Sequence, residues 1–275
     1  MNLLPDSSTA VENCVSVAYS KSQIEKLGER LRVSQKESDL RMLEEHRLSF
    51  GEISHSTAKR VMELLNVPAV ERPAKQTLSI IEKLNREKTN LARMQDLAGC
   101  RIVVPSLSDQ DFAIRVLSAE FSDTKVDDKR DNPRHGYRSV HLISKIDGKL
   151  IELQIRTPSQ NAWANIAERT SRVVDPAIKY GGGPADIQRK LKVFSDSLHT
   201  LDLVYQVATA ALLAKDTPPT ALTSALLALF PQDQVGGGEP TKRKNYIDEL
   251  QDLALSRAIA DGDELVAEVI RIKGS

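Results

Sequence analysis

The sequence has few of the residues, and none of the long runs, that mark several large protein classes. Cysteine occurs only at Cys14 and Cys100, which lie far apart and lack the CxxC spacing of a metal or redox site. There is no apolar run of 18 residues, and the chain does not start with a charged segment leading into an apolar one. By these criteria we expect a cytoplasmic protein without a membrane span.

An excess of one charge sign and an abundance of aromatic residues are also missing. Basic and acidic residues number 38 each, so the net charge gives no reason to expect nucleic-acid binding, and any basic site must be local. Aromatic residues make up 4% of the chain, which predicts an aliphatic core that contains Cys100 and is anchored by the single tryptophan, Trp163. No Walker motif, GxGxxG or kinase HRD pattern is present, so a nucleotide-dependent enzyme would need another fold.

The stretch from Asp127 to Thr157 is the most informative part of the chain. A charged loop, DDKRDNPRHG, leads into the apolar segment YRSVHLI, and Asp147-Gly148 then predicts a tight hairpin turn. The returning strand, LIELQIR, alternates between an apolar face with Ile151, Leu153 and Ile155 and a second face with Leu150, Glu152, Gln154 and Arg156. An acid, an amide and a base side by side on a strand indicate either a solvated sheet face or a functional site.

The order of the predicted elements favours an α+β fold. Helices come first, strands alternating with helices follow, and helices end the chain, which predicts a mixed β-sheet flanked by helices, with helical N- and C-terminal extensions. We expect a flexible segment over residues 1–18, a catalytic domain over 19–212 and a helical extension over 213–275. In that extension, a linker from Gln234 should precede two helices, over 246–260 and 264–272. Phe112 should point inward from a helix over 109–120.

Polar residues that could act together also recur upstream of the hairpin. Four of them fall on one face of a predicted helix, which is either solvated or neutralised by a polyphosphate: Lys75, Ser79, Lys83 and Arg86. Two separated carboxylates, Asp96 and Glu152, could hold one Mg²⁺ together with water. Tyr137 lies in a basic, glycine-containing loop and could stack on a base. Together these parts describe transfer of a phosphoryl-type group from a nucleoside triphosphate to a hydroxyl.

Four segments of the chain resemble, in order, the motifs of the synthetase domain of the RelA/SpoT family: AKQTLSIIEKLNRE, MQDLAGCRIVV, HGYRSVHLI and IELQIRTPSQNAWA. They cover roughly residues 72–168, and the chain from residue 19 onward is similar to the small single-domain members. The resemblance implies a nucleotidyltransferase-like mixed sheet and a Mg²⁺-dependent pyrophosphokinase. Such an enzyme moves the β,γ-pyrophosphate of ATP to the 3′-hydroxyl of GDP or GTP and makes (p)ppGpp, the alarmone of the stringent response.

The resemblance also implies roles for individual residues at the matched positions. ATP would be bound by six of them: Arg72, Lys75, Ser79, Lys83, Arg86 and Arg101. Asp96 and Glu152 would hold the metal, and Glu152 would also activate the attacking 3′-hydroxyl. The acceptor nucleotide would be bound by four residues, with the ring of the tyrosine stacked on its base: Arg134, Tyr137, His141 and Gln154.

The predicted acceptor loop departs from the DYxxxPKxxGY pattern of guanosine-alarmone synthetases. Lys129 stands where that pattern has the tyrosine of DY, and Arg134 stands where it has lysine. The loop is similar to that of toxic small synthetases. A toxin with the same chemistry on the 3′-CCA end of tRNA or on adenosine nucleotides, paired with an antitoxin protein, is therefore an alternative. An inactive nucleotide- or RNA-binding module is a more remote alternative, and a homo-oligomer stays open.

Two further departures concern the first motif and the hydrolase activity of the family. Many members carry an arginine two residues before the first-motif lysine, but this chain has Pro73 there and Arg72 one place earlier. The sequence contains no His-Asp pair of the kind that is typical of the family's hydrolase domain. We therefore expect a synthetase without hydrolase activity.

Overall fold

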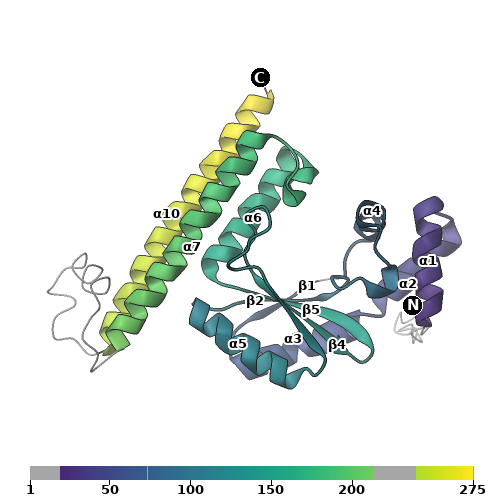
Figure 1. Ribbon diagram of the computed structural model, residues 1–275, viewed down its shortest axis with the longest axis horizontal. Coiled ribbons are helices and arrows are strands. Elements are labelled where there is room, and N and C mark those ends of the chain that lie inside the picture. The colour runs from purple at the N-terminus through teal and green to yellow at the C-terminus, as the bar shows by residue number, and fades with distance from the viewer. Residues whose placement is uncertain (1–18, 73, 214–239, 275) are drawn as a thin grey trace, which may run out of the picture.

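The computed structural model describes residues 19–72, 74–213 and 240–274 (Figure 1). The segment 1–18, for which flexibility is predicted, lies outside these residues, as does most of the linker predicted from Gln234. The division of the chain into units over 19–212 and 213–275 stays a prediction.

The centre of the fold is a five-stranded mixed sheet, which confirms the predicted α+β class. Its strands are β1 (Ala69–Arg72), β2 (Gly99–Val103), β3 (Thr124–Asp128), β4 (Val140–Ile146) and β5 (Lys149–Arg156). They are ordered β1-β2-β5-β4-β3, and only the β2–β5 pair is parallel. The parallel pair joins strands about 50 residues apart in the sequence, with Gly99 opposite Glu152.

The predicted hairpin is confirmed as β4 and β5. Asp147 and Gly148 both have positive φ, 46° and 78°, as a tight two-residue turn that matches the twist of the strands requires. The apolar side chains of β5 are fully buried: Ile151, Leu153 and Ile155. The alternation of this strand therefore directs Glu152 and Gln154 to the opposite face of the sheet.

Helices cover the two faces of the sheet unequally. The helices are α1 (Lys21–Val33), α2 (Glu37–Leu48), α3 (Gly51–Leu65), α4 (Thr77–Glu87), α5 (Leu107–Glu120), α6 (Pro158–Val173), α7 (Ala185–Leu213) and α10 (Pro240–Gly274), with short 3₁₀ turns η1 (Leu91–Arg93) and η2 (Pro176–Tyr180). In Figure 1, α3 and α5 lie beneath the sheet and contact its strands, whereas α4 and α6 lie above it. Helices α7 and α10 lie side by side along α6.

Two hydrophobic clusters hold these layers together. The larger one joins the apolar face of the sheet to α1–α5 and contains Cys100, which is fully buried as predicted. The smaller one joins α6, η2, α7 and α10 around Trp163. The indole Nε1–H of Trp163 donates to the carbonyl of Leu191 at 2.8 Å, so the predicted anchor role of this tryptophan is confirmed. None of the helices in the described ranges has both the length and the apolar composition needed to cross a membrane.

Three sequence-based expectations about the fold were wrong. The two helices predicted over 246–260 and 264–272 are one helix, α10. Gly262, which suggested the break, instead gives room for Ile166 of α6, since a Cβ at this position would overlap the isoleucine side chain. Phe112 is 50% exposed, since Gln110, Ala113 and Leu117 form the buried face of α5. Strand β1 was not predicted, because Pro68 and Pro73 flank its four residues in the sequence and argue against a strand. It lies at the edge of the sheet, where prolines are tolerated.

A buried carboxylate between α6 and α7 makes stability depend on pH. Asp202 accepts a hydrogen bond from Thr157, the N-cap residue of α6, and burial raises the pKa of Asp202 to about 6. Between about pH 4 and pH 6 the folded protein thus keeps a proton that the unfolded chain releases. The free energy of unfolding should therefore fall as the pH rises through this window.

We expect Asp202→Asn to remove this pH-dependent loss. The variant should be more stable than the wild type by about 2–3 kcal/mol at pH 8 and nearly equal to it at pH 4. Urea denaturation at both pH values measures the difference. Asp252→Asn, at an exposed position of α10, is the matched control and should change stability by less than about 0.5 kcal/mol. An Asp202→Asn effect that is the same at both pH values would contradict the prediction.

Candidate active site

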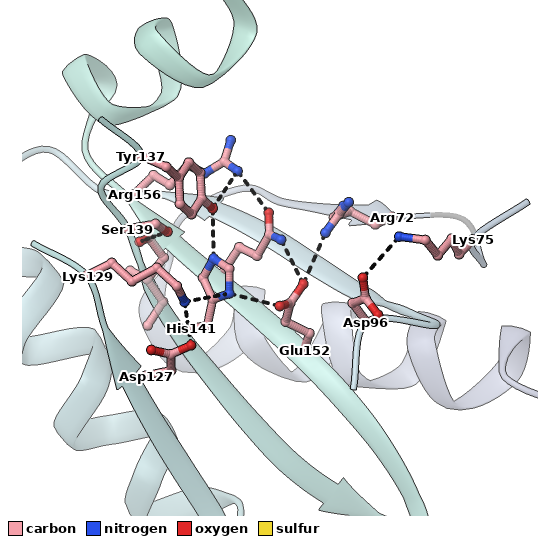
Figure 2. A network of polar contacts seen from close by, with 12 residues as sticks. Arg72, Lys75, Asp96, Asp127, Lys129, Tyr137, Ser139, His141, Glu152 and Arg156 are labelled. Carbon is pink, nitrogen blue, oxygen red and sulfur yellow. Dashed lines mark hydrogen bonds and ion pairs between the residues drawn. The ribbon is translucent and has the colours of Figure 1, made fainter. Parts of the chain in front are cut away.

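The polar side chains of β2, β4 and β5 lie on the face of the sheet opposite α3 and α5. Arg101 is paired with Gln154 across the parallel strands, and His141 is paired with Gln154 on the other side. Paired residues point to the same face, so these side chains form a continuous polar surface. Figure 2 shows that Glu152 and His141 lie near its centre.

Gly99 allows two charged groups to meet across strand β2. Arg72 lies opposite Gly99 on β1, and Glu152 lies opposite it on β5. A Cβ atom at position 99 would overlap the backbone carbonyl of Glu152, and glycine also leaves the space between the neighbouring strands free. The guanidinium of Arg72 reaches over it, with Nη1 at 3.2 Å from Oε2 of Glu152.

Glu152 is the most heavily bonded carboxylate of this face. His141 Nδ1 lies 2.8 Å from Oε1, and Gln154 Nε2 donates to Oε2 at 2.7 Å. Burial raises the pKa of Glu152, but the bonds from His141 and Gln154 and the charge of Arg72 outweigh it, so the net pKa is lowered. For His141, burial lowers the pKa, and the bond to Glu152 reverses the shift, so the net pKa is raised. Glu152 is therefore ionised at neutral pH.

Tyr137 joins this network from the charged loop. Its hydroxyl lies 2.7 Å from His141 Nε2 and accepts a hydrogen bond from Arg156 Nη2 at 2.9 Å. Burial raises the pKa of Tyr137, but the charges of Arg156 and His141 outweigh burial, so the net pKa is lowered to about 8. The tyrosine ring lies 6.1 Å from that of Trp163. His141 thus connects the Tyr137 hydroxyl to Glu152 through its two ring nitrogens (Figure 2).

Asp96 forms a second charged centre, where the chain enters β2. Lys75 Nζ lies 3.0 Å from Oδ2, and Lys83 Nζ lies 2.8 Å from Oδ1, so the two predicted ATP-binding lysines share one carboxylate. Burial raises the pKa of Asp96, but the two ammonium groups lower it below its usual value. Lys83 also lies 3.7 Å from Oε2 of Glu87, so the two ammonium groups are paired with two carboxylates.

The other residues of the predicted ATP site lie around the two carboxylates, Glu152 and Asp96. Ser79 is half-buried on α4, and Arg86, at the end of that helix, lies over the ring of Tyr180 at 3.7 Å from the ring centroid. Arg101 is half-buried between β1 and β5, and its Nε is buried with no hydrogen-bond partner among the described residues. Burial, with the charges of Arg156 and Arg72, lowers the pKa of Arg101.

The structure brings all but one of the predicted site residues to this face or to its rim. The exception is Arg134, whose side chain is exposed on the loop. Burial raises the pKa of Asp127, but the bond to Lys129 and nearby positive charges, that of Arg134 among them, lower it below its usual value. The loop turns through His135 and Gly136, both with positive φ, and a Cβ at Gly136 would lie 2.9 Å from the Trp163 ring.

Sequence reasoning missed three residues of the network. Arg156 donates to Tyr137 and to Gln154, and its place on the polar face of β5 was a signal that could have identified it. Lys129 lies 3.5 Å from His141 Nδ1 and is bonded to Asp127. Tyr180 contacts Arg86 from a segment more than 90 residues away, and no local sequence pattern indicates this contact.

No group of three or more His, Cys, Asp or Glu side chains in the described ranges is arranged to hold a metal ion. The two predicted ligands, Asp96 and Glu152, are both ionised, since the pKa of each carboxylate is lowered. Their segments are neighbours, because the Glu152 amide donates to the Ala98 carbonyl at 3.1 Å. Magnesium is commonly held by one or two carboxylates completed by substrate phosphates and water. The donor set therefore fits Mg²⁺ bound together with a phosphate ligand.

The fold and this polar face define an α+β domain whose charged side chains converge on one side of a mixed sheet. Residues 72–171 match the family model described as the region found in RelA/SpoT proteins. These residues contain Asp96, Tyr137 and Glu152. This part of the chain is therefore similar to a region of RelA/SpoT proteins, in agreement with the resemblance of its motifs.

Individual proteins are also similar to this chain. The uncharacterised protein Rv1366 of Mycobacterium tuberculosis is 31% identical over 137 residues, which are 45% of this chain and 50% of the relative. The GTP pyrophosphokinase YjbM of Bacillus subtilis is 32% identical over 143 residues, 46% of this chain and 65% of the relative. The crystal structure of small alarmone synthetase 1 from Bacillus subtilis has a TM-score of 0.48 at 24% identity, over 59% of this chain and 93% of that one. The match thus spans half to two thirds of the curated relatives.

Proposed function

We propose that this protein is a pyrophosphokinase that moves the β,γ-diphosphate of ATP to the 3′-hydroxyl of GDP or GTP, making (p)ppGpp. The observation that carries the proposal is the cluster of three guanidinium groups on the polar face of the sheet. Arg101 is flanked by Arg72 and Arg156, and its buried Nε has no partner in the described chain. A half-buried guanidinium that lies beside two others and has a donor without a partner is stabilised by an anion, and a triphosphate supplies that anion. Two Bacillus subtilis relatives, YjbM and YwaC, are named GTP pyrophosphokinases, which supports the same activity.

The proposed ATP site lies between α4 and the strands β1 and β2. Its basic residues come from both sides of this space: Arg72, Lys75, Lys83, Arg86 and Arg101, with Ser79 as a hydroxyl donor on α4. Lys75 and Lys83 are paired with Asp96 and can exchange that carboxylate for phosphate oxygens, since both make only charge-assisted bonds there. Neutralising the phosphates in this way is the main requirement of phosphoryl transfer.

Asp96 and Glu152 are proposed to hold Mg²⁺. Their lowered pKa values keep both carboxylates ionised, which a Mg²⁺ ligand must be. When bound, the ion supplies charge neutralisation at the transferred phosphates. Its presence would also release Lys75 and Lys83 from Asp96 toward the triphosphate.

The acceptor is proposed to lie on the Tyr137 side of the face, with Glu152 between the two nucleotides. The 3′-oxygen forms a bond to the β-phosphorus of ATP, the bond from that phosphorus to the α,β-bridging oxygen breaks, AMP leaves, and the hydroxyl proton passes to Glu152. The transition state of such transfers is loose, so positioning and charge neutralisation dominate, and a carboxylate with a lowered pKa suffices as base. His141 and Gln154 hold Glu152 in place.

The proposal is tested with purified protein, Mg²⁺ and ATP labelled at its γ-phosphate. GDP, GTP, adenosine nucleotides and deacylated tRNA are offered as separate acceptors. We expect label in a guanosine product. Label on tRNA or on an adenosine nucleotide would instead assign the toxin chemistry, with Arg134 and Lys129 as candidates for the altered acceptor preference. Protein that binds ATP but labels no acceptor would contradict an enzyme and favour a binding module.

Tyr137→Ala should weaken binding of the acceptor about tenfold or more and leave ATP affinity within about twofold, because a stacked base contributes about 1–3 kcal/mol. Calorimetric titration with the acceptor and with a non-hydrolysable ATP analogue measures both. Tyr137→Phe is the matched control: it keeps the ring and removes the hydroxyl bonds to His141 and Arg156. Equal losses for ATP and acceptor in Tyr137→Ala would contradict stacking.

A further inference from the structure

The 3₁₀ turn η2 contacts the two sides of the proposed active site. On one side, the guanidinium of Arg86 lies 3.7 Å from the centroid of the Tyr180 ring, so the end of η2 meets the end of α4. On the other side, Gly181 lies against the imidazole of His135 in the proposed acceptor loop. Gly181 has φ of 82°, and a Cβ there would overlap the His135 ring, so this close approach requires glycine.

The segment that carries Tyr180 is held in place by its contacts with α7 and the smaller hydrophobic cluster. Ile178 is buried in the smaller hydrophobic cluster, and the Asp175 side chain caps the turn by accepting from the Ala177 amide at 2.8 Å. Gln188 Nε2 of α7 donates to the carbonyls of Ile178, at 2.9 Å, and Gly182, at 2.7 Å. Tyr180 itself remains 51% exposed. A ring held on an anchored turn is a rigid platform rather than a mobile cover.

The guanidinium of Arg86 keeps most of its donors available in this arrangement. Stacking on an aromatic ring uses the flat face of the group and leaves its N–H bonds, which lie in the plane, free to donate. One of them is directed to Glu87, with Nη2 at 3.0 Å from Oε1. Lys83, one turn earlier on α4, points to Asp96. The fork of Arg86 and the ammonium of Lys83 therefore flank the same part of the proposed ATP site.

We infer that Tyr180 is a positioning residue for ATP: it holds the Arg86 guanidinium in the orientation that binds the triphosphate. This inference rests on the proposed function, since it assigns Arg86 to ATP. Its physical basis is pre-organisation, because an arginine already stacked loses less side-chain entropy when phosphate binds. A flexible Arg86, without the ring beneath it, would bind the same phosphate more weakly.

The test compares Tyr180→Leu with Tyr180→Phe in the full chain. Titration with a non-hydrolysable ATP analogue should show about three- to tenfold weaker binding for Tyr180→Leu and wild-type binding, within about twofold, for Tyr180→Phe, which keeps the ring face. In steady state, KM for ATP should rise in Tyr180→Leu, whereas kcat and KM for the acceptor should not change. In an Arg86→Ala background, Tyr180→Leu should have no additional effect on ATP binding.

Three outcomes would overturn the inference. Unchanged or tighter ATP binding by Tyr180→Leu would show that the ring does not pre-organise Arg86. Equal losses in the leucine and phenylalanine variants would assign the effect to the hydroxyl or to the fold, and additive losses in the Arg86→Ala background would remove the coupling. The wild type is titrated first: if it does not bind the analogue, both the proposed function and this inference fail, whereas wild-type binding with an unaffected Tyr180→Leu rejects the inference alone.

Discussion

Glu152→Gln is expected to lower the rate of diphosphate transfer by about 10²–10⁴-fold while the protein still folds and binds ATP. Glutamine has nearly the shape of glutamate but cannot take the hydroxyl proton, and it is a poor ligand for Mg²⁺. It also leaves His141 and Arg72 without the carboxylate that each contacts. Because glutamine keeps one side-chain oxygen that can accept hydrogen bonds from these partners, we expect the larger loss in kcat and a smaller one in stability.

Single-turnover rates with labelled ATP measure the effect of Glu152→Gln, and titration with a non-hydrolysable analogue checks ATP binding. Glu71→Gln is the matched control. It makes the same chemical change on β1, but at an exposed side chain that contacts His55, on the opposite face from Arg72. Turnover by Glu152→Gln at the wild-type rate would remove Glu152 from the proposed mechanism. Loss of ATP binding as well would show that its main role is to keep the site assembled.

Gly99→Ala is expected to destabilise the protein by about 3 kcal/mol or more and to abolish transfer. The added Cβ would overlap the carbonyl oxygen of Glu152, which is backbone and cannot rotate away. Relief of that overlap requires β2 and β5 to separate or shift. Either movement breaks the parallel pairing that places Arg101 beside Gln154 and displaces Glu152 from Arg72. Stability and activity should therefore fall together.

Urea denaturation and the transfer assay measure the two effects of Gly99→Ala. Gly51→Ala is the control, because it lies in the first turn of α3 with open space around it and its substitution favours the helix. We expect that control to be neutral or slightly stabilising. A Gly99→Ala protein with wild-type stability would show that the strands can separate at this point without cost, and that the register of β2 and β5 is less constrained than the overlap implies.

Features that depend on near neighbours in the sequence were predictable. The alternation of β5 placed Ile151 and Leu153 in the core and Glu152 on the polar face, since side chains on a strand alternate. The Asp147-Gly148 turn defined the hairpin because only a few residue pairs accept positive φ at both positions. The spacing of Ser79, Lys83 and Arg86 grouped them on α4 for a similarly local reason, whereas Lys75, which was expected on the same helix, lies before its N-cap residue Gln76.

Expectations failed where a distant contact outweighed a local signal. Gly262 suggested a break between two C-terminal helices, yet packing against Ile166 makes glycine the residue that fits inside a continuous α10. Strand β1 has too few residues to show a period, and it exists because it pairs with β2. The acceptor role of Arg134 stays a prediction: its side chain is exposed on the loop that turns through His135 and Gly136.

By itself, the sequence determined the strands β2 to β5, the hairpin, the basic face of α4 and the family motifs that contain Asp96, Tyr137 and Glu152, because each is a property of a short segment. Only the tertiary structure decided how these groups are paired. The register of β2 with its two neighbours places Arg101 beside Gln154 and Arg72 beside Glu152. Folding places Lys75 and Lys83 on one carboxylate, and η2 brings the Tyr180 ring against Arg86. Such pairings join segments separated by tens of residues, and they are selected by packing, which no local period encodes.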